Sequence, residues 1–409
     1  MIPVLYILSS LVTFRFSKNV LHPAFLMISV WSIGFSTIYL IPSFYKPSLI
    51  SSIIIYSYLF IFITVSILTH LSLVNINIKE LKDTSIDRSF LNFISIFLFV
   101  GLILYISRYL SVMFSFSSIT EYFYRVRYAA LYTGEPLVKT GWLLTQIKTY
   151  SIIITPIYLY NALVSKFNFL KSLFCVSFIF LTLVSNIIEG ARNEFVILSL
   201  IYISVIMVKK GIKMTFYISI IFLFLLILLT SFTRGLILDM QILINFFMHI
   251  IMYMFGSIIS FDSFINNNME VVSSIVGKLE RYYNFISYHL HFIKPLEFSS
   301  TKEIEFTQIS NDLRTNVYSF LSVRIHYFGF AGSYLTIFIQ SFMVTILYYL
   351  RKNKLFLFLY IFMIPSIILS VFHDYFIAMI PYYFRLIFLL IILFYLKPSK
   401  FFKKTFLIN

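Results

Sequence analysis

The sequence predicts an all-α polytopic membrane protein with about 11 (10–12) transmembrane helices and a large extracytoplasmic loop. Hydrophobic residues make up 60% of the 409 positions and charged residues only 12%. A soluble domain of this size carries roughly 25% charged residues. Apolar runs close to the ~20 residues that a spanning helix needs recur along the whole chain. Basic residues gather in every second connection between these runs, as expected for helices that cross a membrane in alternating directions.

The apolar runs lie at approximately 1–14, 21–43, 48–74, 90–107, 141–164, 172–189, 195–208, 215–233, 327–350, 355–372 and 377–396. No basic residue precedes the first run and no small-residue cleavage site follows it, so we expect a retained span rather than a signal peptide.

One set of alternate connections carries 17 basic residues, two to four in each: Arg15 and Lys18; Lys79, Lys82 and Arg88; Lys166 and Lys171; Lys209, Lys210 and Lys213; Arg351, Lys352 and Lys354; Lys397, Lys400, Lys403 and Lys404. The short connections of the opposite set hold only Lys46 and Arg192. Because Lys and Arg near span ends stay in the cytoplasm, the N-terminus is predicted to be periplasmic and the C-terminus cytoplasmic.

This topology divides the chain into three parts. Residues 1–233 form an N-terminal transmembrane bundle with an outer loop at 108–140, and residues 327–409 form C-terminal spans with a basic cytoplasmic tail. Between them, residues 234–326 form the large periplasmic loop. It opens with an apolar segment, 236–257, in which Gln241, Asn245 and His249 make one polar stripe. We interpret this segment as an interfacial helix, with a twelfth span as the alternative.

The composition offers no material for a cofactor site. The single cysteine, Cys175, lies inside an apolar run, and no Cys/His cluster has metal-ligand spacing. Neither a Gly-rich phosphate loop nor a GxGxxG motif is present. We therefore predict no metal and no cofactor, and a substrate that carries its own activation.

Charged residues on the predicted outer face are the candidate functional residues. They are Glu121, Arg125, Arg127, Glu189, Arg192, Arg234, Arg314, Arg324, His326 and Asp374, with Arg385 inside the last run. Arginine binds phosphate through two parallel hydrogen bonds, so several arginines on one membrane face favour a site for a polyanion such as a lipid-linked diphosphate. Contacts with lipid headgroups, or with nearby Glu and Asp, are the alternative for any single arginine.

A segment at 315–342, TNVYSFLSVRIHYFGFAGSYLTIFIQSF, resembles the end of the large periplasmic loop in O-antigen (Wzy-type) oligosaccharide repeat-unit polymerases. In that family a T-N-V-Y-T-like run leads through G-x-x-G into a span. HPAFLMISVWSIGFSTIYL at 22–40 and NIIEGARNEFVIL at 186–198 are similar to two further family features. The resemblance implies a fold similar to GT-C-like polymerases and ligases.

The resemblance also implies a function: a glycosyltransferase of the bacterial inner membrane that works without metal or nucleotide sugar at the periplasmic face. It would transfer a growing glycan from undecaprenyl diphosphate to the next lipid-linked repeat unit. The expected partners are undecaprenyl-diphosphate-linked glycans and membrane lipids, with a chain-length regulator and a flippase, and no nucleic acid.

Under this hypothesis each candidate residue receives a role. Arg192, Arg234 and Arg324 would clamp the leaving diphosphate, while Arg314, Arg125 and Arg127 would hold the second diphosphate or the acceptor glycan; Arg385 completes the diphosphate-binding set. His326 is the first choice for the base, with Glu189, Glu121 and Asp374 as rivals and an interfacial hydrogen-bonding role as its alternative. Tyr318 and Tyr327 would stack on sugars.

Two other functions compete with the polymerase. An O-antigen ligase shares the architecture but would place a His followed by an Asn in the large loop, whereas His326 is followed by Tyr327. A lipid-linked oligosaccharide flippase would have short connections, and the long 234–326 loop argues against it.

Overall fold

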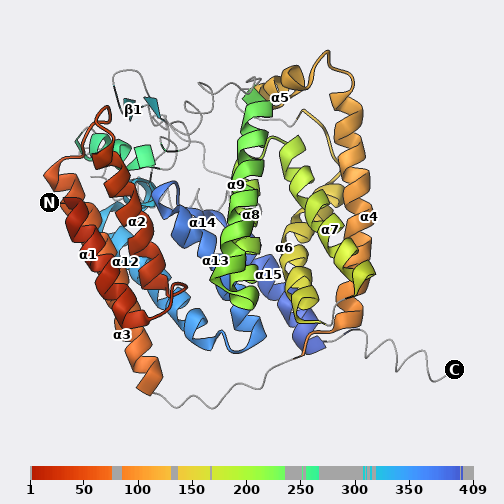
Figure 1. The fold of residues 1–409 in the computed structure, drawn as a ribbon. Coiled ribbons are helices and arrows are strands. Elements are labelled where there is room, and N and C mark those ends of the chain that lie inside the picture. The colour runs from red at the N-terminus through yellow and green to blue at the C-terminus, as the bar shows by residue number, and fades with distance from the viewer. Residues whose placement is uncertain are drawn as a thin grey trace. The chain divides into compact units, whose positions relative to one another are not determined.

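In the residues that it describes, the computed structural model is almost entirely helical (Figure 1). It describes residues 2–75, 85–129, 137–165, 168–234, 251, 255–266, 307–308, 310, 314–315, 319–396 and 398. The chain divides into two compact units, which do not follow the order of the sequence. Unit 1 consists of Met1–Asp83 and Phe247–Phe384, and unit 2 of Thr84–Phe246 and Arg385–Asn409.

Within the described residues, six helices are long and apolar enough to cross a membrane: Pro23–Leu40, Leu49–Val74, Arg88–Met113, Phe169–Ile188, Phe328–Leu350 and Lys354–Val371. Three shorter apolar helices are Ile2–Ser17, Ile212–Leu223 and Ile380–Leu396. Each of the eleven predicted spans coincides with a helix. The all-helical fold class is thereby confirmed, and the six long apolar helices are compatible with a polytopic membrane protein, whereas the count of eleven spans stays a prediction.

Unit 1 contains the elements α1 (Ile2–Ser17), α2 (Pro23–Leu40), α3 (Leu49–Asn75), β1 (Thr307–Gln308), β2 (Arg314–Thr315), α12 (Phe320–Leu350), α13 (Lys354–Ile368), η3 (Leu369–Val371), α14 (Tyr375–Ala378) and the start of α15 (Ile380–Ile391). The two short strands pair antiparallel. Pro23 opens α2, where its missing N–H has no helical partner to lose.

Polar side chains join α3 to α12 inside unit 1. The Tyr58 and Tyr334 rings stack with centroids 4.0 Å apart, and the Thr345 hydroxyl donates to Ser66 at 2.8 Å. The Ser341 hydroxyl donates to the Phe62 carbonyl at 2.6 Å. In a lipid environment such bonds and close packing replace the hydrophobic effect as the force that joins helices.

Residues 255–266 form a helix that is packed into unit 1, although the sequence puts them at the start of the large loop. A Cβ atom on Gly34 of α2 would lie 2.9 Å from Ile258 Cδ1, so a larger residue there would force the Ile258 side chain to shift. Asp262 accepts a hydrogen bond from the Ser48 backbone N–H at 3.0 Å, just before α3 begins. Most of the predicted interfacial helix at 236–257 lies outside the described residues.

Unit 2 contains α4 (Arg88–Met113), α5 (Ile119–Tyr128), α6 (Trp142–Val164), α7 (Phe169–Ile188), α8 (Arg192–Lys210), α9 (Ile212–Arg234), the end of α15 and the π-helical turn η4 (Ile392–Leu396). Helix α4 packs against α6 and α7. A Cβ on Gly101 would lie 2.7 Å from Ile147 Cδ1, so glycine allows α4 and α6 to approach.

The charges of unit 2 separate along its helices. Lysines occupy the start of α7 and α9 and the end of α8: Lys171, Lys213, Lys209 and Lys210. Lys209 Nζ lies 4.2 Å from the ring centroid of Tyr160, near the end of α6, so these helix ends lie together. The opposite end, where α4 and α7 end and α6 and α8 begin, is called here the α5 end.

Candidate functional site

At the α5 end of unit 2, one lysine contacts two carboxylates from neighbouring helices. Lys148, near the start of α6, forms an ion pair with Glu189, directly after α7, and a second one with Glu194 in the first turn of α8. The Lys148 Nζ–Glu194 Oε2 distance is 2.7 Å. The lysine side chain is 7% exposed, against 21% for Glu189 and 37% for Glu194. The cluster is therefore anchored in the helix bundle and open to solvent on its carboxylate side.

The turn between α7 and α8 brings the two carboxylates together. Gly190 has φ +70°, a left-handed conformation that favours glycine, and its N–H donates to the Ile187 carbonyl at 2.9 Å. The Ala191 N–H donates to the Asn186 carbonyl at 2.9 Å. This tight reversal places Glu189 and Glu194 on either side of one turn, and both face Lys148.

Tyrosines extend the polar cluster into unit 2. The Tyr109 hydroxyl donates to Glu189 Oε1 at 3.2 Å, and the Tyr105 hydroxyl donates to Tyr109 at 3.3 Å. From α5, the buried Tyr122 hydroxyl donates to the Ile188 carbonyl at 2.7 Å. Glu189 is thus held by side chains from two other helices, and α5 is docked on the turn that carries it.

Charge balance sets the protonation state of this cluster. One buried lysine balances one carboxylate, so the second negative charge has no equal partner among these three residues. Burial, together with the neighbouring Glu194, raises the pKa of Glu189 to about 9. At neutral pH Glu189 therefore holds a proton, so its contact with Lys148 is a hydrogen bond from the ammonium to the carboxyl oxygen. A carboxyl group with so large a shift, at a partly exposed cluster, is a candidate functional group.

Glu121 and Arg125 lie on α5, where Glu121 is half-buried and Arg125 is exposed. Ser118 caps α5 by accepting from the Glu121 N–H at 3.1 Å, and Glu121 Oε2 accepts from the Ser117 hydroxyl at 2.5 Å. The hydrogen bond from Ser117 lowers the pKa of Glu121, with a further contribution from Arg125. Glu121 thus stabilises the start of a helix, and its role as a base stays a prediction.

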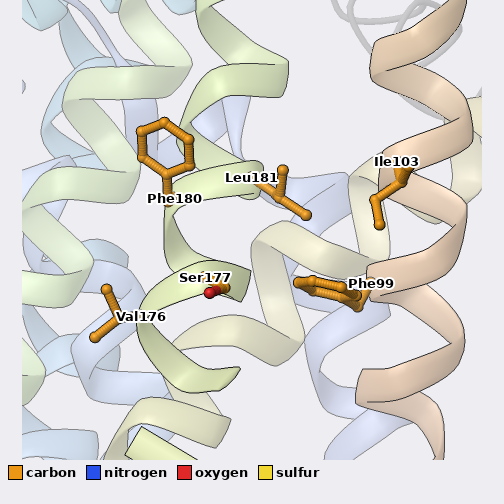
Figure 2. Close-up of a pocket in the computed structure, with 6 residues that line it drawn as sticks. All are labelled: Phe99, Ile103, Val176, Ser177, Phe180 and Leu181. Atoms are coloured by element: carbon orange, nitrogen blue, oxygen red, sulfur yellow. The ribbon is translucent and has the colours of Figure 1, made fainter. Parts of the chain in front are cut away.

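Below the α5 end, α4 and α7 form an apolar pocket of about 400 Å³ (Figure 2). It is lined by Phe99, Ile103, Val176, Ser177, Phe180 and Leu181. Val176 and Phe180 are exposed at the surface of unit 2. Glu189 follows Phe180 by nine residues, about 13 Å along a helix. An apolar surface and a charged cluster therefore follow one another on α7.

In unit 1, the site residue Arg324 is fully buried rather than open to solvent. Its Nε donates to Asp374 Oδ2 at 2.7 Å and its Nη2 donates to Asp374 Oδ1 at 3.0 Å. Nη2 also donates to Gln340 Oε1 at 2.6 Å. Its Cζ lies 4.9 Å from the ring centroid of Phe320 and 5.6 Å from that of Phe376. A charge at this depth is stable because a carboxylate neutralises it and aromatic faces surround it.

The structure assigns Asp374 a second contact, since it caps α14 by accepting from the Ile377 N–H at 3.4 Å. Asp374 is therefore committed to Arg324 and to a helix N-terminus. The roles of Arg324 as a phosphate ligand and of Asp374 as a base stay predictions.

The structure brings some predicted site residues together and leaves others without description. Glu121, Arg125 and Glu189 lie at the α5 end of unit 2, and Arg324 pairs with Asp374 in unit 1. Arg385 is half-buried in α15. The side chains of Arg127, Arg192, Arg234, Arg314, Tyr318, His326 and Tyr327 lie outside the described part of the chain.

Lys148 and Gln340 were missed by the sequence reasoning. Each is a polar residue within an apolar helix, and such residues usually face a partner inside the bundle. That signal was available for both, but their partners lie 41 and 16 residues away. Among the described residues, no group of three or more His, Cys, Asp or Glu side chains is placed to hold a metal ion.

Comparison of the chain with models of protein families gives no match. Comparisons with curated proteins and with solved structures give no significant match either.

Proposed function

We propose that this chain is a membrane glycosyltransferase that polymerises undecaprenyl-diphosphate-linked oligosaccharide repeat units, for O-antigen or a related surface polysaccharide. It acts at the periplasmic face of the bacterial inner membrane, with the N-terminus periplasmic and the C-terminus cytoplasmic. The proposal rests on the resemblance of residues 315–342, 22–40 and 186–198 to Wzy-type polymerases. Six helices able to span a membrane are consistent with it.

The observation that carries the proposal is the Lys148–Glu189–Glu194 cluster at the turn 186–198, one of the three similar segments. The Lys148–Glu194 ion pair holds the start of α8, where Arg192 is the first helical residue. Free backbone N–H groups at a helix start favour anions, so they add to the attraction of Arg192 for a diphosphate. The Lys171 and Lys209 end of the same helices corresponds to the cytoplasmic side in this proposal.

The reaction is a displacement at the anomeric carbon of the donor glycan. The acceptor hydroxyl oxygen forms the new bond to that carbon, and the bond from carbon to the phosphate oxygen breaks. The undecaprenyl diphosphate leaves with the bonding electron pair, and the hydroxyl proton passes to a base, for which we propose His326. Arginine side chains stabilise the charge that develops on the leaving diphosphate.

The test is a deletion strain complemented with variants and scored by the length of surface glycan on gels. We expect R192A and R125A to shorten the glycan, because each removes a cation from the proposed diphosphate site. K210A, at the opposite end of α8, is the matched control and should leave the length unchanged. Full-length glycan from the R192A/R125A double variant would contradict the proposal that these two arginines bind the substrate diphosphates.

The same deletion strain separates the proposed polymerase from its rivals. Lipid A cores capped with single repeat units indicate a lost polymerase, whereas cores without any cap indicate a lost ligase. A flippase would also leave cores uncapped, but its loss would keep lipid-linked units on the cytoplasmic side of the membrane. Either uncapped result would contradict the proposed function.

A further inference from the structure

Helix α12 is made of two helical pieces that meet at Gly329. The backbone of Gly329 has φ 68° and ψ −179°, which no α-helix contains and which only glycine adopts without strain. A short piece, 320–328, precedes it, and a long piece, 330–350, follows it. The chain therefore turns sharply at Gly329, which is called the corner below.

The hydrogen bond between Arg324 and Gln340 shows how sharp this corner is. Sixteen residues of straight helix would separate their Cα atoms by about 24 Å, farther than the two side chains together can reach. Yet Arg324 Nη2 and Gln340 Oε1 lie 2.6 Å apart. The short piece must therefore fold back along the long piece, so that Arg324 reaches a side chain about three turns beyond the corner.

The folded-back piece is held inside unit 1 on several sides. Phe320, Leu321 and Ile325 are buried, and the ring of Phe320 meets Trp31 of α2 edge-on at 5.8 Å. Asp374 binds Arg324 through both carboxylate oxygens and also caps α14. This packing and the ion pair fix the position of the short piece within unit 1.

We propose that Asp374 and Gln340 are positioning residues. By binding Arg324 they hold the folded-back segment 320–328 in place, and with it the backbone at His326. This inference rests on the proposed function, in which His326 is the base. His326 follows Arg324 by two residues on the same short helix. Any loosening of the segment therefore displaces the base relative to the acceptor hydroxyl, whereas Arg192 and Arg125, the cations proposed above to bind diphosphate, lie on other helices.

The first test follows the segment itself and needs no activity. In a chain with Cys175 replaced (C175S), the buried Ser322 is changed to cysteine (S322C) and labelled with maleimide in lipid nanodiscs. The exposed Thr120 on α5 supplies the control (T120C). We expect slow labelling at 322 that D374N accelerates about a hundredfold, since removing one partner of a buried ion pair populates the opened state. Labelling at 120 should not change.

The second test measures polymerisation of purified lipid-linked repeat units by the same variants. A displaced base should lower kcat about a hundredfold in D374N with KM nearly unchanged. Q340L keeps the ion pair and should give a smaller loss, and D374E, which keeps the charge, should recover part of the rate. Q340L also provides the measurement if D374N does not fold.

The two tests fail in different ways. Rapid labelling of S322C in the otherwise unchanged chain, or no acceleration by D374N or Q340L, would overturn the positioning role whatever the protein's activity. An increase in KM with kcat unchanged would also overturn it. If the parent chain polymerises nothing but shows the expected labelling pattern, the proposed function is wrong. The positioning of segment 320–328 by Asp374 and Gln340 would still be supported.

Discussion

Arg324 of α12 and Asp374 at the start of α14 form a side-on ion pair, in which Nε and Nη2 of the guanidinium each meet one carboxylate oxygen, at 2.7 and 3.0 Å. Both side chains are buried, and the residues lie 50 positions apart in the sequence. The pair links the short first piece of α12, 320–328, to the connection that follows α13. It is a strong constraint on the fold of unit 1 because neither charge is stable there alone.

Replacement of Asp374 by alanine is expected to destabilise the protein by about 3–5 kcal/mol, because Arg324 would be left buried without a counter-charge. The double replacement R324M/D374L should cost much less, since it removes both charges and keeps apolar volume. The measurement is thermal unfolding in detergent followed by size-exclusion chromatography. K210A, at an exposed position, is the control. Equal losses in the single and double variants would contradict an ion pair that acts as a unit.

Glu189 should make the stability of the protein fall as pH rises between about 4.5 and about 9. Its folded pKa of about 9 lies above the ordinary value of 4.5, so its stabilising contribution is complete below about pH 4.5 and is gone once pH has risen through about 9. E189Q, which is always neutral, should weaken this loss. The melting temperature between about pH 6 and about pH 9 measures it.

The control for that experiment is E121Q. The pKa of Glu121 is lowered by Ser117, so this side chain is already ionised throughout the alkaline range and should not change the profile. If E189Q and the parent chain lost stability in parallel as pH rose, the prediction that Glu189 is protonated in the folded protein would be wrong.

His22 should contribute to loss of stability in acid. Its ring is buried, neither ring nitrogen has a hydrogen-bond partner among the described residues, and it lies edge-on to His70 and Tyr348. Burial, with His70 and Arg351 nearby, lowers its pKa from 6.5 to about 3. A depressed folded pKa gives stability that is present above about pH 6.5 and lost as pH falls.

The corresponding variant is H22F, which keeps a ring in the same space and cannot be protonated. We expect H22F to match the parent near neutral pH and to retain a higher melting temperature at about pH 5. H22Q, which is also neutral but lacks the ring, separates the loss of packing from the loss of charge. An H22F chain that loses as much stability in acid as the parent would refute this origin of the sensitivity.

The positions of the helices were predictable because each spanning helix needs its own uninterrupted apolar run. A local pattern of about 20 residues carries that information, and every predicted run is helical in the structure. The tight turn at Glu189–Arg192 was also visible locally, through Gly190 between two apolar runs. Glu189 and Asp374 were predicted as site residues from their positions at the ends of apolar runs. The sequence pattern did not identify the side chains with which they pair, Lys148 and Arg324.

The sequence by itself determined which segments are apolar helices and which polar residues lie at their ends, because hydropathy and charge act residue by residue along the chain. Only the tertiary structure decided that Lys148 joins Glu189 and Glu194, and that Arg324 turns inward to Asp374 and Gln340. Those choices depend on which helix faces meet and on the corner at Gly329. A buried charge must find a counter-charge wherever packing brings one, and no local pattern specifies that place.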